Sequence, residues 1–304
     1  MCALLLLTFV LGVAACADRG ADGAVDESDQ QLPAAEADTG SDPTPSEREP
    51  PDSEPSQSEP SEPEPPPEPE PPPLTGRIIA IDPGHNGGNF DAPEEIGRPV
   101  DAGGFTKPCN TTGTASDDGY RESTFNLEIA LGLREVLEAR GAQVHLTRES
   151  DDGVGPCVDV RGSFADTVGA EVYLSIHADG APADARGFHV IRPTTGGAVY
   201  PTMLPASAEL AEAVRDALLA AGFTPADYAG EDGIAARGDL ATLNLSSVPV
   251  VLPEAGNMRN PDDLAQLRNP ESQARLVEAL ASALDRTLHC HTAGTRMPRC
   301  DLAD

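Results

Sequence analysis

Short apolar runs, rich in β-branched residues and bounded by turn residues, recur along residues 74–304 of the chain. Runs of this length and composition are typical of buried strands. They predict strands at Ile78–Asp82, Gln143–Arg148, Val172–His177, Gly187–Arg192 and Val248–Pro253. The first run stops at Pro83-Gly84, because proline removes a backbone donor and glycine permits a tight loop.

Longer segments between these runs carry apolar residues at helical spacing. They predict helices at Ser123–Ala139, Val158–Val168, Ala206–Ala221 and Pro270–Leu288. Strands that alternate with helices predict an α/β fold, with a mostly parallel, twisted sheet and helices on both faces. Residues 86–120 have neither pattern and read as a long, polar, glycine-rich loop. A connection of this length inside a compact domain is usually functional.

The first 15 residues are mostly apolar and end in small residues, as a secretory signal peptide does. The run is too short to span a bilayer comfortably. Val13-Ala14-Ala15-Cys16 resembles a bacterial lipobox, which would make Cys16 the lipid-modified first residue of the mature protein. A plain cleaved signal peptide is the alternative. In both cases we expect the protein outside the cytoplasm, in the cell wall or bound to the membrane only through the lipid at Cys16.

Residues 16–73 form a proline-rich acidic segment that we expect to be a disordered linker. Residues 17–73 hold 17 acidic residues, 2 basic residues and 15 prolines. A segment with so little apolar content cannot offset the entropy of ordering it. Proline and charge repulsion keep such a chain extended, so it would hold the following domain away from a membrane.

Residues 74–304 carry 34 acidic and 18 basic residues, which argues against nucleic acid as a partner. We expect this part to be one domain and the protein to be a monomer. An even number of cysteines outside the cytosol predicts disulfides. Of the three possible pairings among the last four cysteines, we favour Cys109–Cys157 with Cys290–Cys300, which closes a short C-terminal loop. A zinc site at His289-Cys290-His291 and Cys300 is the weaker alternative.

Candidate chemistry gathers where the predicted strands end. His85 lies just past the first strand, His177 ends the third, and Glu254 directly follows the last. Glu122 opens the first helix, where a carboxylate alone would be explained by the helix dipole. Because ligands of open α/β sheets bind at the carboxyl ends of the strands, these side chains are expected to meet. Two histidines and one carboxylate suit zinc, and a further carboxylate can accept a proton from water.

Other polar residues read as structural. We expect His145 and His189 to lie within strands without a catalytic role. Arg148 and Arg161 are expected to tie loops to carboxylates. Arg237 and Asn257 could line the groove and are weaker candidates.

Five stretches of the sequence form an ordered set of motifs: Ile-Ala-Ile-Asp-Pro-Gly-His85, Glu122-Ser-Thr-Phe-Asn126-Leu, Leu-Thr-Arg148, Ser-Ile-His177-Ala-Asp and Pro-Val-Val-Leu-Pro-Glu254-Ala-Gly-Asn-Met-Arg-Asn. Together they resemble the zinc-dependent N-acetylmuramoyl-L-alanine amidases, a family of cell-wall hydrolases. Each motif alone is weak, but five in this order across residues 77–288 are specific. Asp179 and Asp166 depart from the family pattern, which has Asn at these positions, and neither is a ligand. The helix that blocks the site of some relatives is not evident, since Ile191–Pro205 reads as loop.

The resemblance implies that His85, Glu122 and His177 bind Zn²⁺ and that Glu254 is the catalytic carboxylate. The implied reaction is hydrolysis of the amide between N-acetylmuramic acid and L-alanine of peptidoglycan, by a catalytic domain at residues 74–304. The main alternative is a non-catalytic peptidoglycan-binding or regulatory domain, which would be expected to lose a ligand or the carboxylate. Another zinc hydrolase and a solute-binding lipoprotein are further alternatives.

Overall fold

A computed structural model describes residues 71–292 of the chain, with side chains described as far as residue 289. The predicted signal peptide, the lipid site at Cys16 and residues 16–70 of the predicted linker lie outside the described residues. The side chains of the predicted Cys290–Cys300 pair also lie outside them. Among the described helices, none is both long and apolar enough to cross a membrane.

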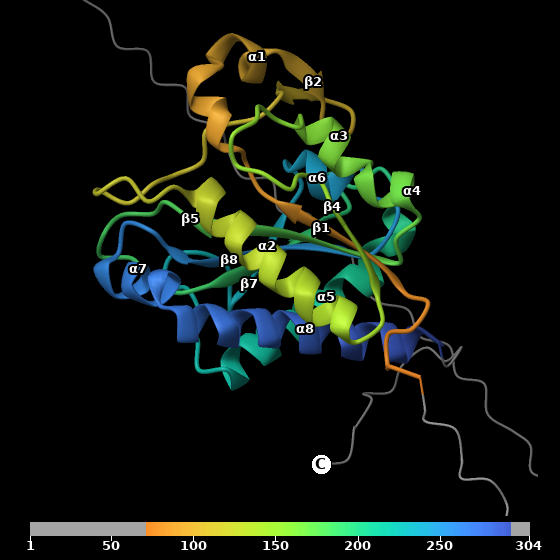
Figure 1. Cartoon of the computed structure of the whole chain (residues 1–304). Helices are drawn as coiled ribbons and strands as arrows, with labels where there is room; N and C mark the ends of the chain where they lie inside the picture. The colour runs from red at the N-terminus through yellow and green to blue at the C-terminus, as the bar shows by residue number, and fades with distance from the viewer. Residues whose placement is uncertain (1–70, 293–304) are drawn as a thin grey trace, which may run out of the picture. The chain divides into compact units, whose positions relative to one another are not determined.

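A six-stranded sheet forms the centre of the domain, in the order β4-β1-β5-β8-β6-β7 (Figure 1). Its strands are β1 (Ile78–Pro83), β4 (Gln143–Leu146), β5 (Val172–Asp179), β6 (His189–Pro193), β7 (Ile234–Arg237) and β8 (Val250–Asn257). The first four strands in this order are parallel neighbours. At β8 the direction changes, because β6 runs antiparallel to β8 and β7 runs parallel to β6. The predicted α/β fold with a mostly parallel sheet is therefore confirmed.

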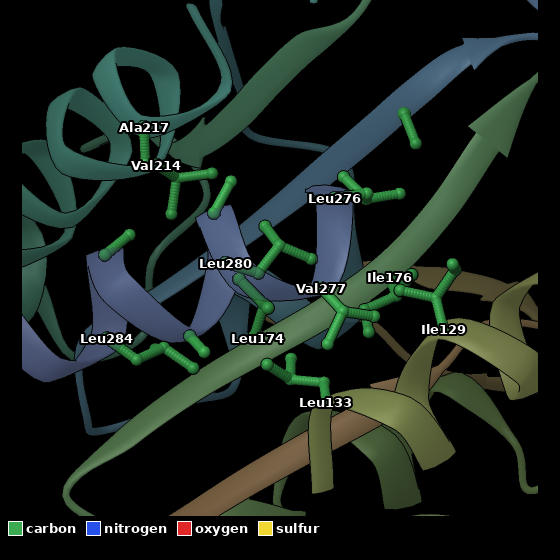
Figure 2. Packing of buried hydrophobic residues seen from close by; sticks show 14 of the residues in the cluster. Ile129, Leu133, Leu174, Ile176, Val214, Ala217, Leu276, Val277, Leu280 and Leu284 are labelled. Atoms are coloured by element: carbon green, nitrogen blue, oxygen red, sulfur yellow. The ribbon is translucent and has the colours of Figure 1, made fainter. Parts of the chain in front are cut away.

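Three long helices cover one face of the sheet: α2 (Glu122–Ala139), α5 (Leu204–Ala220) and α8 (Pro270–Thr292). Figure 2 shows their apolar side chains meeting those of β5. The labelled side chains of this layer include Ile129, Leu133, Leu174, Ile176, Val214, Leu280 and Leu284. Full burial of one such side chain stabilises the fold by about 1.5–3 kcal/mol, so this layer holds the sheet rigid beneath the site.

The opposite face is covered by short helices, α3 (Val158–Gly162), α4 (Phe164–Val168) and α6 (Ala241–Asn244). The prediction of one continuous helix over Val158–Val168 was wrong, since the chain breaks between α3 and α4 at Ser163. The break lies beside a close approach to α6, since a Cβ on Gly162 would lie 2.7 Å from the carbonyl oxygen of Ala241.

The predicted structureless loop at residues 86–120 is partly ordered into small elements. It contains η1 (Gly87–Asp91), α1 (Pro93–Gly97) and an antiparallel hairpin of β2 (Pro99–Asp101) and β3 (Thr106–Pro108). A disulfide between Cys109 and Cys157 joins the end of this hairpin to the segment that precedes α3. The favoured first disulfide is thus confirmed, and it closes the long loop over the carboxyl edge of β1.

Two further elements were not predicted from the sequence. The strand β7 is only four residues long, with two exposed positions. The helix α7 (Pro261–Arg268) begins at an N-cap, Asn260, whose side chain accepts hydrogen bonds from the backbone of Asp262 and Asp263. The segment between β6 and α5 holds only the short η2 (Pro201–Met203), which agrees with the loop expected there.

Candidate functional site

The carboxyl edge of the sheet brings together three ligand-type side chains. His85 follows β1, His177 lies near the end of β5, and Glu122 begins α2. One nitrogen from each histidine and one carboxylate oxygen all lie within 4.8 Å of one another. Glu122 Oε1 lies 3.2 Å from His85 Nε2 and 2.9 Å from His177 Nδ1. The two imidazole rings meet edge to face, with their centres 4.9 Å apart.

Two buried arginines hold the loop that carries His85. Arg161 donates to the carbonyl oxygens of Pro83, at 2.9 Å, and His85, at 2.6 Å. Arg148 donates to Pro83, at 2.9 Å, and to Gly84, at 3.0 Å. These contacts fix three consecutive carbonyls. His85 itself adopts a left-handed backbone with φ 58°, a conformation that costs energy outside glycine and needs such support.

The charge of Arg161 is balanced by Asp82, the last polar residue of β1. Both side chains are at most 2% exposed and form an ion pair. Asp82 also accepts hydrogen bonds from Thr147 Oγ1 at 2.5 Å and Ser175 Oγ at 2.7 Å. Burial alone would raise the pKa of Asp82, but Arg161 and these hydroxyl groups lower it below its ordinary value. The prediction that Arg148 and Arg161 tie loops and carboxylates together agrees with these contacts.

The Glu122 carboxylate is held by backbone donors as well as by the histidines. Its Oε2 accepts from Thr114 N at 2.9 Å, and its Oε1 accepts from Ala178 N at 3.4 Å. Burial would raise the pKa of Glu122, but His85 and His177 lower it well below its usual range. The carboxyl group is therefore ionised, as a metal ligand must be.

Glycines make room for this cluster. A Cβ on Gly84 would lie 2.2 Å from His177 Cε1. A Cβ on Gly113 would lie 2.8 Å from Glu122 Oε2 and 2.9 Å from His85 Cδ2, and its φ of +75° also disfavours any other residue. Both contacts are much closer than real Cβ atoms allow. The backbone is therefore packed directly against the three ligand-type side chains.

The donor set fits a divalent transition metal. The Nδ1 of His85 lies 3.1 Å from the carbonyl oxygen of Thr111, and a carbonyl can only accept. The hydroxyl oxygen of Thr111 lies 3.2 Å from the same nitrogen. With Nδ1 turned to Thr111, Nε2 faces the carboxylate of Glu122. A lone pair and a carboxylate repel each other unless a cation or a proton lies between them. Two imidazole nitrogens and one carboxylate oxygen, oriented by such outer contacts, are a typical three-ligand zinc set.

Glu254 stands beside this cluster on the neighbouring strand. It pairs in register with His177 of β5, and both line one pocket of about 340 Å³. Its Oε2 atom is buried and has no hydrogen-bond partner. Burial, together with the charges of Glu122 and Asp179, raises the pKa of Glu254 well above its usual value. A carboxyl group in this state holds a proton more readily than an exposed one and is a candidate for proton transfer.

A family model described as N-acetylmuramoyl-L-alanine amidase matches residues 79–286, which include every residue of this cluster. The chain belongs to this amidase family.

The most similar relatives include mycobacterial amidases. The chain is 42% identical to an N-acetylmuramoyl-L-alanine amidase of Mycobacterium tuberculosis over 208 residues, 68% of this chain and 84% of that protein. It superposes on a crystal structure of an N-acetylmuramyl-L-alanine amidase from Mycobacterium smegmatis with a TM-score of 0.67 and 40% identity. That match covers 71% of this chain and 99% of the other. The apo amidase of Mycobacterium abscessus gives the same TM-score and identity, with 71% and 100% coverage.

The polar residues expected from the sequence to be structural or weaker candidates do not line the pocket that holds Glu254. Asn257 is fully buried, so the expectation that it could line a groove was wrong. Arg237 is exposed and forms two hydrogen bonds with Asp239. His145 lies in the outermost strand β4. His189 is buried in β6, in register with Glu254, and contacts no ligand-type atom of the cluster.

Sequence reasoning missed several residues that position the amidase site. Thr114 contributes its backbone N–H and Thr111 its backbone carbonyl, which leave no side-chain signal, although Thr111 Oγ1 also lies 3.2 Å from His85 Nδ1. Gly84 and Gly113 could have been found, because a glycine beside a ligand often marks a close approach. Arg259 also lines the pocket and follows Glu254 within the last matching stretch.

Proposed function

We propose that the chain is a zinc-dependent amidase that hydrolyses the bond between N-acetylmuramic acid and L-alanine in peptidoglycan. One observation carries the proposal: three ligand-type atoms within 4.8 Å of one another share a pocket with a carboxyl oxygen that is buried and unpartnered. Family membership gives the substrate class. In this reading His85, Glu122 and His177 hold zinc, and Glu254 stays free of the metal.

A zinc ion bound there would supply Lewis-acid chemistry, which polarises a carbonyl and activates water. The chain supplies the proton transfers. Glu254 accepts a proton from the attacking water as the new C–O bond forms at the lactyl carbonyl. It then donates that proton to the departing nitrogen as the C–N bond breaks. The products are a lactyl carboxylic acid and a free L-alanine amine, and Glu254 returns to its starting state.

The raised pKa of Glu254 suits this role. A general base works best with a pKa near the operating pH, and a carboxyl group reaches that range through burial and like charges nearby. Both causes are present here, since Oε2 of Glu254 is buried and the side chain lies near Glu122 and Asp179. A non-catalytic peptidoglycan-binding domain would not need a proton carrier with this environment.

Metal content is the first test. We expect one zinc per domain in the wild type and loss of both zinc and activity in His177→Ala. His145→Ala is the matched control, because His145 belongs to the same sheet but not to the cluster. Metal analysis and release of stem peptide from purified peptidoglycan, followed by mass spectrometry, give the result. Near-stoichiometric zinc in His177→Ala would contradict the ligand assignment.

Glu254→Gln separates catalysis from metal storage. Glutamine keeps the shape of the side chain but cannot accept the proton, so turnover should fall by about 10²–10⁴-fold. Zinc content, melting temperature and peptidoglycan binding should stay near those of the wild type. The exposed Glu135→Gln is the control for a generic charge change. Activity close to wild type would place the catalytic carboxylate elsewhere, and the non-catalytic alternative would then be favoured.

The cellular location follows from the substrate. Peptidoglycan lies outside the cytoplasm, so an amidase that acts on it must be exported. We propose that the first 15 residues direct export, that Cys16 carries a lipid anchor, and that residues 16–73 act as a spacer for a monomeric domain. Mass spectrometry of the mature N-terminus tests the anchor: a lipidated Cys16 is expected, and an unmodified N-terminus would favour plain secretion.

A further inference from the structure

The pocket beside Glu254 is acidic except at one point. Among the described residues that line it, Glu122, Asp179 and Glu254 are carboxylates, and Arg259 is the only side chain with a permanent positive charge. A bound zinc ion would offset the charge of the carboxylates and would not pair with Arg259, since both are cations. Arg259 is therefore the group of this lining that an anionic part of a ligand would meet.

Arg259 is also free to bind one. Its side chain is exposed and makes no hydrogen bond, ion pair or ring contact with any described residue. Neighbouring arginines differ in this respect: Arg237 pairs with Asp239, and Arg186 lies 3.8 Å from Asp262. An unpaired guanidinium at the mouth of a polar pocket is available for a ligand with a carboxylate or phosphate group.

The backbone that presents Arg259 is rigid. The buried side chain of Asn257 accepts from Arg259 N at 3.0 Å and Ala181 N at 3.1 Å. It also donates to the carbonyl oxygens of Pro182, at 2.8 Å, and Ala185, at 2.7 Å. One amide group thus satisfies four backbone partners and locks the turn after β8 to the loop before β6. Little ordering of the backbone is needed when a ligand binds to Arg259, which favours affinity.

We propose that Arg259 is a specificity-determining residue that binds a carboxylate of the stem peptide. The inference rests on the proposed amidase function and deepens it. In the stem peptide, the glutamate that follows L-alanine is joined onward through its side chain, so its α-carboxylate is free. Arg259 lies five residues after Glu254, and both line the pocket. In this proposal the guanidinium binds the carboxylate one residue beyond the departing amine, while Glu254 serves the amine itself.

Two substrates that differ at one group test this. They are N-acetylmuramoyl-L-alanyl-γ-D-glutamyl-L-lysine, which has the free α-carboxylate on its glutamate, and the isoglutaminyl form, in which that group is a neutral amide. The side-chain carboxyl group of the glutamate is amide-bonded to lysine in both. We expect Arg259→Gln to lower kcat/KM for the carboxylate form by about tenfold or more, as for loss of a charge-assisted hydrogen bond. The amide form should change by no more than about twofold. Arg259→Lys, which keeps the charge but loses the planar fork, should lie between.

Arg186→Gln is the matched control, because it removes the same charge from a nearby loop but does not line the pocket. It should leave the ratio of the two substrates unchanged. An equal loss on both substrates in Arg259→Gln, or no loss on either, would overturn the inference while leaving the amidase function standing. A wild type that releases peptide from neither substrate would instead overturn the proposed function itself.

Discussion

The buried pair of Arg161 and Asp82 gives a sharp prediction about stability. Arg161→Met keeps the apolar stem but removes the guanidinium and its hydrogen bonds to the carbonyls of Pro83, His85, Gly155 and Pro156. It also leaves the Asp82 carboxylate unpaired at 1% exposure. Breaking a buried pair from one side typically costs about 3–5 kcal/mol. For a domain of this size, that loss corresponds to a fall in melting temperature of about 6–20 °C.

The matched control is Arg134→Met. Arg134 lies 3.1 Å from Glu149, but the two side chains are 28% and 72% exposed, so this pair should contribute at most about 1 kcal/mol. Urea unfolding of wild type and both variants at neutral pH measures the difference. A cost for Arg161→Met no larger than that for Arg134→Met would refute the reasoning about the buried pair.

The pH dependence of the unfolding free energy gives a second test of the ion pair between Arg161 and Asp82. In the wild type, the folded-state pKa of Asp82 is lowered, so its contribution is present above the unfolded pKa and is lost as pH falls through the folded pKa. In Arg161→Met, burial without a partner raises the pKa of Asp82, and acid relieves the penalty by protonating it. The gap between wild type and variant should therefore be largest near neutral pH and narrow on acidification. A gap that widens at low pH would contradict this assignment.

Three further predictions concern the cluster and its loop. Gly84→Ala should abolish metal binding in metal analysis, because its Cβ would fall 2.2 Å from His177 Cε1; normal metal content would show that the loop can move aside. Metal affinity, measured by titration with a chromophoric chelator, should fall as pH is lowered, since the pKa of His85 is raised and its proton competes with the metal; affinity that rises in acid would be the contrary result. The double variant Cys109→Ser with Cys157→Ser should lose about 2–5 kcal/mol of unfolding free energy, and an unchanged urea midpoint would rule that contribution out.

The strands could be predicted because each is a short run of buried β-branched residues between turn signals. β1 and β5 begin where the sequence predicts, and their ends place His85 and His177 at the edge expected for a parallel sheet. The run that became β8 was found too, although the strand extends to Asn257. The last residues of β8 include polar residues and a glycine, so a search for runs of buried apolar residues does not detect this part of the strand.

What could not be predicted depends on contacts between distant segments. The break between α3 and α4 arises where Gly162 meets α6, some eighty residues later in the chain, and no local signal marks it. The short β7 forms only because it pairs with β6. At the site, the backbone N–H of Thr114 donates to Glu122 without any requirement on the Thr114 side chain. The candidate metal ligands could be predicted because their side-chain types are typical of metal sites. The backbone groups that hold them could not be predicted, because every residue has a backbone.

The change of strand direction at β8 divides the edge of the sheet into two kinds of border. Strands β1, β5 and β8 end at this edge, with His85 just after β1 and His177 and Glu254 within the last residues of β5 and the second half of β8. Strands β6 and β7 begin at this edge instead. Residues inserted before β6 or β7 would lie around the pocket without changing the length of the segments that follow β1, β5 and β8. Substrate preference could therefore vary on one half of the pocket rim, while the half that carries the candidate site keeps its dimensions.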